Sequence, residues 1–389
     1  MDIDFTNLDD IDIDKEGITK TKLNKYIIII PTISIIISMF IIITSFYFLI
    51  KGDYKKEKKE IPKNCIEGDD DLCSRCENDK CVSCNYKYRF ENGSCIPEFS
   101  FKIIYETIEF NETIEIVDEN YKYNIKEIDL DKEVIDMSEV ERTGLKFILE
   151  EPGNHTVYLS FNTKSMNEIK TSIFGSVDKI IYIHFSKKFN TENITKMARL
   201  FYEYKKLKYI DISNLNLEKM TQMDNIFYGC SSLTSVKLPN SSAPLLKSLN
   251  YMFTNCENLT SISFSKGMNY STESLTEFKG MFSGCKSLTS IDFSYLKTNN
   301  ISNTIDMFRN CISLTSLDLS NFTTSDLKMD NMFSNCSKLN YLDISNFGIP
   351  LSYNNCMTNL PSKGKIRLNK KINNFFKKFV PDSWTFDII

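Results

Sequence analysis

A repeated motif constrains the fold of this chain more than any other feature of its sequence. The stretch MFRNCISLTSLDLSNF, residues 307–322, has counterparts at intervals of 25 to 29 residues. The residues at the cysteine position of the seven copies are Val177, Tyr204, Cys230, Cys256, Cys285, Cys311 and Cys336. One copy has too few apolar residues to offset the entropy of ordering its backbone, so this period predicts a solenoid of stacked units.

Within each copy the spacing of the apolar residues changes halfway. Before the cysteine it follows steps of three and four, as in Met329, Met332 and Phe333, which predicts one face of a helix. After the cysteine it alternates, as in LDL at 317–319, which predicts a strand. We therefore expect an α/β solenoid, a leucine-rich-repeat array of about seven repeats over 166–360, with a parallel concave sheet.

The repeat cysteines are Cys230, Cys256, Cys285, Cys311 and Cys336. Two copies have valine or tyrosine at this position, and neither residue forms disulfides or replaces a thiolate as a metal ligand. A disulfide between neighbouring copies would need Cα atoms within ~7 Å, whereas packed helices lie ~8–10 Å apart. The position is therefore predicted to hold a buried apolar side chain.

The repeat resembles the BspA-type leucine-rich repeat family, whose unit reads roughly MF-x-x-C-x-x-L-x-x-L-D-L-S-x-F-x-T. Residues 332–336 (MFSNC) and 314–324 (LTSLDLSNFTT) match this unit, and 361–389 looks like the C-terminal cap of the family. Known members are surface proteins of microbes and parasitic protists. The resemblance implies attachment to host proteins or to other cells.

Two shorter segments precede the repeats. Alternating apolar and polar residues in FKIIYETIEF at 101–110 and HTVYLSF at 155–161 predict strands, so we expect a β-rich N-terminal cap module over 98–165. A cysteine-rich module over 64–97 contains Cys65, Cys73, Cys76, Cys81, Cys84 and Cys95. Its two C-x-x-C pairs are too close together for a zinc ribbon, so disulfides are predicted, with fifteen possible pairings. The module loosely resembles furin-like or EGF-like modules.

An apolar segment near the N-terminus predicts attachment to a membrane. Residues 26–50 contain no charge over twenty-five residues, enough to cross ~30 Å of hydrocarbon at ~1.5 Å per residue. The apolar region of a cleaved signal peptide is shorter, ~7–15 residues. We therefore predict a transmembrane signal anchor between a disordered cytosolic tail over 1–25 and a charged stalk over 51–63.

Two features disagree on the orientation of this anchor. Six lysines just after the span, against four before it, favour a cytosolic C-terminal part. The six clustered cysteines favour an oxidising space. We expect a plasma-membrane protein with an extracellular C-terminal body. The candidate glycosylation sites are then Asn92, Asn111, Asn154, Asn193, Asn240, Asn258, Asn269, Asn300, Asn321 and Asn335.

The outward residues of the predicted strands are the candidate binding site. They form two columns across the sheet, because side chains alternate between its faces. The candidates are Tyr182, His184, Tyr209, Asp211, Ser290, Asp292, Ser316, Asp318, Tyr341 and Asp343. The simpler interpretation is that these residues only keep the face hydrated and soluble. The more specific interpretation is a ligand-binding surface, since solenoids bind partners along their extended faces.

Catalysis and nucleic-acid binding are not expected. The chain has two histidines without a partner nearby in sequence, no glycine-rich phosphate loop, and a net charge of −4 without an extended basic block. We expect no catalytic residue, cofactor or metal ligand. The predicted function is that of a single-pass surface binding or adhesion protein whose concave face engages a protein or glycan. A structural coat protein without a specific ligand is the alternative.

Overall fold

The computed structural model describes residues 73–77, 80–84, 88–91, 94–97, 99–135, 145–164, 166–169, 173–264, 274–296 and 298–389. Over 73–97 it has two strand pairs, β1 (Cys73–Glu77) with β2 (Lys80–Cys84) and β3 (Tyr88–Glu91) with β4 (Ser94–Pro97). The predicted tail, membrane anchor and stalk lie outside the described residues, as do Cys65 and the side chains of the other clustered cysteines. Among the described residues, no helix combines the length and apolar character needed to cross a membrane.

The β-rich segment before the repeats is built on strand β5 (Phe101–Thr107). This strand lies between β10 (Gly153–Phe161) and β11 (Ile180–Phe185) and is antiparallel to both. Its alternate residues are buried, as the alternation in FKIIYET predicts. The remaining elements of this segment are β6 (Glu112–Glu115), η1 (Glu119–Asn124), β7 (Ile125–Leu130), β8 (Glu133–Val134) and β9 (Lys146–Leu149).

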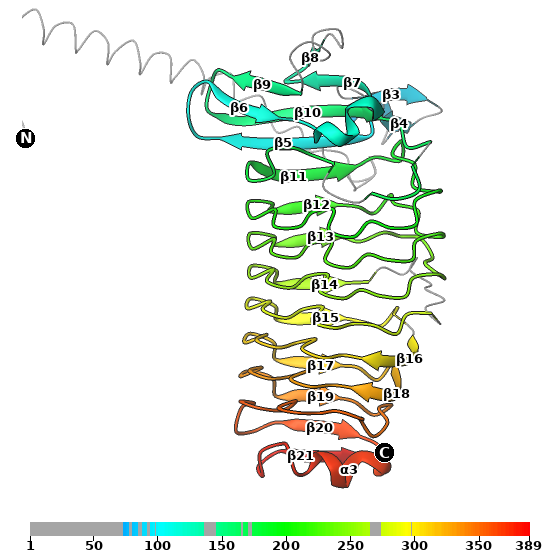
Figure 1. The fold of residues 1–389 in the computed structure, drawn as a ribbon, viewed down its shortest axis with the longest axis vertical. Helices are drawn as coiled ribbons and strands as arrows, with labels where there is room; N and C mark the ends of the chain where they lie inside the picture. Colours follow the sequence, from blue (N-terminus) through cyan, green and yellow to red (C-terminus); the bar gives the residue numbers. More distant parts are fainter. Residues whose placement is uncertain are drawn as a thin grey trace, which may run out of the picture. The chain divides into compact units, whose positions relative to one another are not determined.

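The repeats form coils that follow one another along a stack (Figure 1). Each coil contributes one short strand, namely β11, β12 (Tyr209–Asp211), β13 (Ser235–Lys237), β14 (Ser261–Ser263), β15 (Ser290–Asp292), β17 (Ser316–Asp318), β19 (Tyr341–Asp343) and β20 (Lys365–Leu368). Paired strands are parallel and in register, so that Leu317, Leu342 and Ile366 occupy equivalent inward positions. The predicted parallel strand column is therefore present.

The prediction that the segments before the cysteine position are helical is wrong. These segments consist of turns, and two residues four positions apart have positive φ in each of the seven coils that follow β11. The pairs are Arg199 and Glu203, Asn225 and Gly229, Tyr251 and Asn255, Gly280 and Gly284, Asp306 and Asn310, Asn331 and Asn335, and Asn355 and Asn359. A right-handed helix cannot contain left-handed residues. Two successive four-residue turns place apolar residues at steps of three and four, as a helix would, so the fold is a β-solenoid rather than an α/β solenoid.

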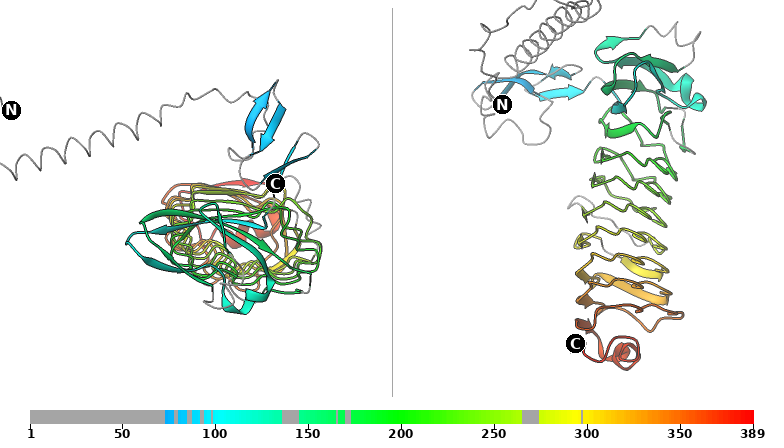
Figure 2. Two further views of the ribbon diagram at one scale, coloured as in Figure 1. Left: turned by 90° about the horizontal axis from the view of Figure 1, so that it is seen from above. Right: turned by 90° about the vertical axis from the view of Figure 1, so that its left-hand side faces the viewer.

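The turn segments are hydrogen-bonded between coils much as the strands are. Alternate backbone amides donate to the next coil, as from Phe308 N to Met332 O and from Asn310 N to Ser334 O, both 2.9 Å. A further parallel pair, β16 (Thr298–Asn303) with β18 (Phe322–Lys328), bridges the coils elsewhere (Figure 2, right). Leucine-rich solenoids curve when bulkier helices space the outer side more widely than the strands. The described coils between β11 and β20 contain no helices that would widen the outer side in this way. We therefore call the outward surface of the strand column the strand face rather than a concave face.

Aromatic rings and thiols run through the core in parallel columns. Six phenylalanines, one in each of six consecutive coils, stack with ring centroids 5.3 to 5.9 Å apart, and they are Phe201, Phe227, Phe253, Phe282, Phe308 and Phe333. We call this column the phenylalanine spine. The five repeat cysteines are free and buried beside it.

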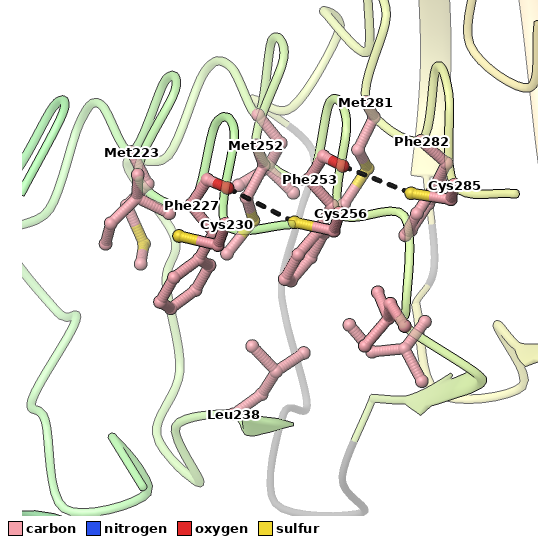
Figure 3. Packing of buried hydrophobic residues seen from close by; sticks show 14 of the residues in the cluster. Met223, Phe227, Cys230, Leu238, Met252, Phe253, Cys256, Met281, Phe282 and Cys285 are labelled. Carbon is pink, nitrogen blue, oxygen red and sulfur yellow. Dashed lines mark hydrogen bonds between the residues drawn. The ribbon is translucent and has the colours of Figure 1, made fainter. Parts of the chain in front are cut away.

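Each repeat cysteine also contributes a hydrogen bond. Cys256 Sγ donates to Phe227 O at 3.2 Å, and Cys285 Sγ donates to Phe253 O at 3.1 Å (Figure 3). Burial raises the pKa of Cys336 to about 12, so this thiol stays protonated and can donate. Each of these thiols is thus hydrogen-bonded to a backbone carbonyl of the preceding coil. The prediction of a buried apolar side chain did not include this bond.

The stack contains a further coil that the repeat motif does not reveal. Residues 349–368 continue it, with Phe333 N donating to Cys356 O as Phe308 N donates to Met332 O. Within it, residues 351–360 read LSYNNCMTNL and have cysteine in place of the motif's methionine, which hides the match. The chain then closes with α3 (Lys370–Phe376), which buries Ile372 and Phe376, and β21 (Thr385–Ile388), which pairs with β20.

Candidate functional site

The structure brings the predicted columns together on the strand face. In the first column, Tyr182, Tyr209 and Ser235 are in register, as are Ser261 with Ser290 and Ser316 with Tyr341. In the second column, His184, Asp211 and Lys237 are in register, as are Ser263 with Asp292 and Asp318 with Asp343. The ten predicted candidates are among these fourteen residues and lie on the strand face, but their surroundings divide it into two ends and a middle.

The end near β11 is closed by paired side chains. The rings of Tyr182 and Tyr209 stack with centroids 5.4 Å apart, and Lys102 Nζ lies 5.9 Å from the Tyr182 ring. Asp211, with a side chain only 5% exposed, has its Oδ2 3.3 Å from Lys237 Nζ and 3.6 Å from His184 Nδ1. Burial alone would raise the pKa of Asp211, but the His184 and Ser213 contacts outweigh it and hold the pKa well below its usual value.

Asp211→Asn is expected to reduce the free energy of unfolding at pH 7 by about 1–3 kcal/mol, because Lys237 and His184 lose a buried charged partner. The folded-state pKa of Asp211 is lowered, so its stabilisation is fully present above about pH 4 and decreases as the pH falls further. Urea unfolding at pH 7, 5 and 3 measures this. The control is Asp292→Asn, expected to change stability by less than about 0.5 kcal/mol. An Asp211→Asn effect of equal size at pH 7 and pH 3 would contradict the assignment.

The opposite end of the strand face is also occupied by ion pairs. Asp343 Oδ2 lies 3.9 Å from Arg367 Nη1, and Asp387 Oδ2 lies 3.1 Å from Lys365 Nζ. Tyr341 is half-buried beside them. The middle differs, because the outward residues of β13, β14, β15 and β17 are all exposed. Within the described part of the chain, Asp292 and Asp318 have no ion pair.

The aspartates of the second column also have a structural task. The Oδ1 atoms of Asp211, Asp292, Asp318 and Asp343 accept the backbone N–H of the serine two residues later, at 2.8 to 3.0 Å. This contact closes the turn after each strand, as Asp side chains do in Asx-turns. The Asp-x-Ser spacing in the sequence was the available signal for it. The carboxylate row therefore does not by itself indicate a ligand.

Asparagine side chains connect successive coils. Asn214 Nδ2 donates to Phe185 O at 2.9 Å, and Asn369 Nδ2 donates to Ser345 O at 2.8 Å. Two predicted glycosylation sites take part in such contacts, since Asn321 Nδ2 donates to Ser294 O and Asn335 Nδ2 to Asn310 Oδ1. A glycan on either nitrogen would compete with these bonds. Asn111, Asn154, Asn193, Asn240, Asn258 and Asn300 are exposed, and Asn92 and Asn269 lie outside the described residues.

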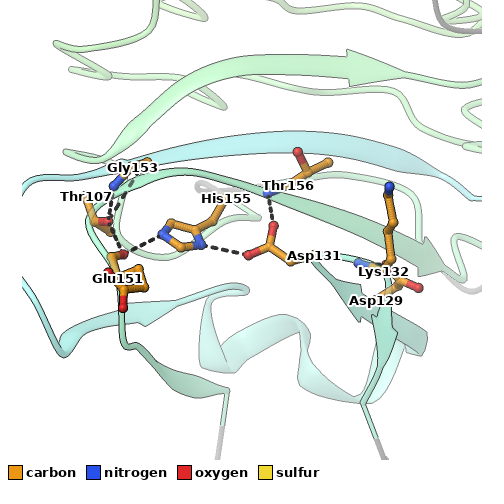
Figure 4. A network of polar contacts seen from close by, with 8 residues as sticks. All are labelled: Thr107, Asp129, Asp131, Lys132, Glu151, Gly153, His155 and Thr156. Carbon is orange, nitrogen blue, oxygen red and sulfur yellow. Dashed lines mark hydrogen bonds and ion pairs between the residues drawn. The ribbon is translucent and has the colours of Figure 1, made fainter. Parts of the chain in front are cut away.

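His155 lies in a separate polar network in the N-terminal module (Figure 4). Its Nδ1 is 2.7 Å from Asp131 Oδ2, and its Nε2 is 2.9 Å from Glu151 O. Asp131 Oδ1 also accepts from Thr156 N at 2.7 Å. The histidine thus joins the turn between β7 and β8 to the segment before β10, with both ring nitrogens engaged. Its partner Asp131 is 24 residues away, which is why the sequence reading missed it.

Comparison with known proteins identifies the family. A family model described as Mycoplasma protein of unknown function, DUF285, matches residues 159–264 and 247–375, together more than half of the chain. Neither range includes 64–97, the segment that resembles furin-like or EGF-like modules. No curated protein matches. The chain is similar to a solved structure described as a T. pallidum leucine-rich repeat protein, with 21% identity, a TM-score of 0.34, and coverage of 53% of this chain and 80% of that chain. On the match of the family model, this chain belongs to the DUF285 family.

Proposed function

We propose that this chain is a membrane-anchored surface protein that binds a partner through the strand face. The supporting observation is the contrast along that face. Its two ends are filled by stacked rings and ion pairs, whereas the outward residues from β13 to β17 are exposed. Long solenoid sheets offer extended surfaces of this kind for binding. The occupant is an extracellular protein or glycan.

The anchor and the orientation of this proposal rest on the sequence. The uncharged segment over 26–50 would hold the chain in the plasma membrane, and the clustered cysteines after it suit an extracellular body. The proposal includes no catalysis. His155 binds Asp131 and Glu151, and His184 Nδ1 lies 3.6 Å from Asp211 Oδ2.

Cells that display the full chain test the proposal. External protease should remove the C-terminal epitope from intact cells, and the cells should adhere to immobilised matrix proteins or to other cells. Replacing Tyr209, Asp292, Asp318 and Tyr341 by alanine should lower adhesion about tenfold or more, as loss of central contacts does. The matched control replaces two tyrosines and two acids on the turn segments, Tyr202, Tyr228, Glu203 and Glu257, and should adhere normally.

Two outcomes contradict the proposal. Protection of the C-terminal epitope from external protease would place the body inside the cell. Dense display without adhesion, or adhesion unaffected by the four strand-face substitutions, would remove the strand face as a binding site and favour a structural coat.

A further inference from the structure

The most exposed apolar side chains gather at the two ends of the stack. Seven large apolar side chains of the described residues are 62% to 89% exposed, and no other exceeds 52%. Five belong to the N-terminal module, residues 99–135 and 145–164, and two belong to the last coil; they are Ile108, Phe110, Tyr123, Val134, Ile148, Ile349 and Leu351. Exposed apolar side chains that gather in one region mark interaction sites. Both ends of the stack are therefore candidates for contact with a partner.

The two ends carry opposite net charges. The described residues of the N-terminal module include twelve acidic residues and six lysines, a net charge of −6. The C-terminal cap, residues 361–389, contains seven lysines and arginines and two aspartates, a net charge of +5. Opposite charges attract each other and like charges repel, so a contact between two copies would favour unlike ends.

Two neighbouring turns form one of the candidate surfaces. The turn between β5 and β6 lies beside the turn between β9 and β10, because Asn111 N donates to Glu150 O at 3.2 Å and Thr107 Oγ1 to Glu151 O at 3.4 Å (Figure 4). The exposed side chains of these turns and of β9 are called the acidic surface, and they are Ile108, Glu109, Phe110, Ile148, Glu150 and Glu151. Within the described part of the chain, its three carboxylates have no ion pair.

The other candidate surface joins the last coil to the C-terminal cap. The Tyr353 ring packs against Phe375 and Phe379, with centroids 4.7 and 5.2 Å apart. Lys371 is one helical turn from Phe375, and Lys378 directly precedes Phe379. The exposed side chains here are called the basic surface, and they are Ile349, Leu351, Tyr353, Lys371, Lys377 and Lys378. No described residue forms an ion pair with these three lysines, although Lys377 Nζ lies 5.6 Å from the Phe386 ring.

The two surfaces cannot meet within one chain. The N-terminal module pairs with the first solenoid strand, β11, and the C-terminal cap pairs with the last, β20, at the opposite end of the stack (Figure 1). The eight strands from β11 to β20, at ~4.8 Å per step, hold these ends roughly 34 Å apart. A second copy supplies both the opposite charge and an apolar counterpart, so the contact needs no other component.

We propose that the basic surface of one copy of this chain binds the acidic surface of a second copy. The contact buries the exposed apolar side chains and pairs the lysines with the carboxylates. It is heterologous, since two different surfaces meet. This inference goes beyond the proposed function, because it involves neither the strand face nor a different protein or glycan.

An anionic lipid bilayer is the competing occupant of the basic surface, because it too attracts lysines beside apolar side chains. A bilayer would leave the apolar side chains of the acidic surface unexplained, since its negative charge repels the carboxylates beside them. A second copy accounts for both surfaces with one contact, and it is therefore the occupant that the charges favour.

Fluorescence cross-correlation of the full chain in an uncharged detergent tests the inference. Two batches of chain carry different fluorophores, and joint diffusion of the two colours reports association between copies. The wild type should associate with itself. Raising the salt concentration from about 0.05 to 0.5 M should weaken this association about tenfold or more, because salt screens exposed charges.

Charge reversal at one end should remove the association, and mixing should restore it. The basic-surface variant is Lys371→Glu with Lys378→Glu, and the acidic-surface variant is Glu109→Lys with Glu150→Lys. Each variant alone should associate at least about tenfold more weakly than the wild type, because like charges then meet. A mixture of the two should associate nearly as well as the wild type, since each supplies the surface that the other has lost. Restoration in the mixture also shows that both variants are folded.

The matched control reverses two exposed lysines of the middle coils, Lys219→Glu with Lys286→Glu, and should associate like the wild type. The inference is overturned if the wild type does not self-associate, if either end variant associates as tightly as the wild type, or if the mixture associates no better than each variant alone. Binding to vesicles of phosphatidylcholine and phosphatidylserine without self-association, lost in the basic-surface variant, would instead identify a lipid surface as the occupant.

This inference and the proposed function can fail separately. The four alanine substitutions on the strand face should leave self-association unchanged. If copies associate as expected but displayed chains adhere to no other protein or cell, the end contact is right and the strand-face function is wrong. If adhesion depends on the strand face but the copies do not associate, the reverse holds.

Discussion

Phe282→Ala is expected to reduce the free energy of unfolding by about 3–5 kcal/mol, the usual cost of deleting a buried phenyl ring. Phe282 is fully buried in the middle of the phenylalanine spine. Its ring stacks on Phe253 at 5.5 Å and on Phe308 at 5.7 Å, and it meets Phe293 edge to face at 6.2 Å. The substitution therefore leaves a cavity between three coils, and the turns around it are tied by hydrogen bonds that limit collapse.

The chain contains one tryptophan, Trp384, so tryptophan fluorescence during unfolding reports on a single position. The Trp384 side chain is buried near the end of the stack, and its Nε1 donates to Pro361 O at 2.9 Å. Urea unfolding followed by tryptophan fluorescence reports on this end, and circular dichroism reports on all strands. Coincident transitions would mean that the coils unfold together, as tight coupling between repeats requires.

Lys286→Ala is the control for Phe282→Ala. Lys286 belongs to the same coil, and its side chain is 53% exposed and forms a surface ion pair with Glu257 at 2.8 Å. Its loss should cost less than about 1 kcal/mol. A cost below about 1 kcal/mol for Phe282→Ala would show that the spine is not a main source of stability.

Phe101→Ala should have a comparable effect of about 3–5 kcal/mol at the other end of the stack. Phe101 lies on β5, the strand that pairs with the first solenoid strand, β11. Its ring contacts four other rings, with centroids 4.5 to 5.8 Å away, and these are Phe161, Phe174, Phe185 and Phe189. This aromatic cluster joins the N-terminal segment to the first coil.

Amide hydrogen exchange locates the effect of Phe101→Ala. Exchange should become faster in β11 and β12 and change least in β19 and β20, because each coil contacts only its neighbours. Lys102→Ala is the matched control on the opposite face of the same strand, and its loss should cost less than about 1 kcal/mol. Equal acceleration along the whole stack would contradict this local picture, and no change in β11 would contradict the capping role of β5.

The two columns of the strand face could be predicted from sequence because strand alternation is local. Leu317 marks the inward position of its strand, so its neighbours Ser316 and Asp318 point outward. The turn segments were misread because Met329, Met332 and Phe333 have a spacing that suits a helix and also two successive turns. The recurring Asn and Gly residues four positions apart, such as Asn331 with Asn335, carried the signal for left-handed turns.

Contacts between distant residues could not be predicted in this way. Asp131 and His155 are 24 residues apart, and nothing in either local sequence indicates the other. The division of the strand face into paired ends and an exposed middle also depends on contacts between residues that are distant in sequence. Asp211 forms an ion pair because its neighbour in the next coil is Lys237, whereas the neighbour of Asp318 is another carboxylate, Asp343. Both aspartates stand in similar Asp-x-Ser motifs.

The sequence by itself determined the length of the coil, the residues that face the core and the residues that face outward. These depend on apolar periodicity, which each coil carries within its own 25 to 29 residues. Only the tertiary structure decided the left-handed turns, the thiol bonds between coils, and which part of the strand face stays exposed. Those features depend on hydrogen bonds and charge pairs between coils, whose partners are set by stacking and not by local order.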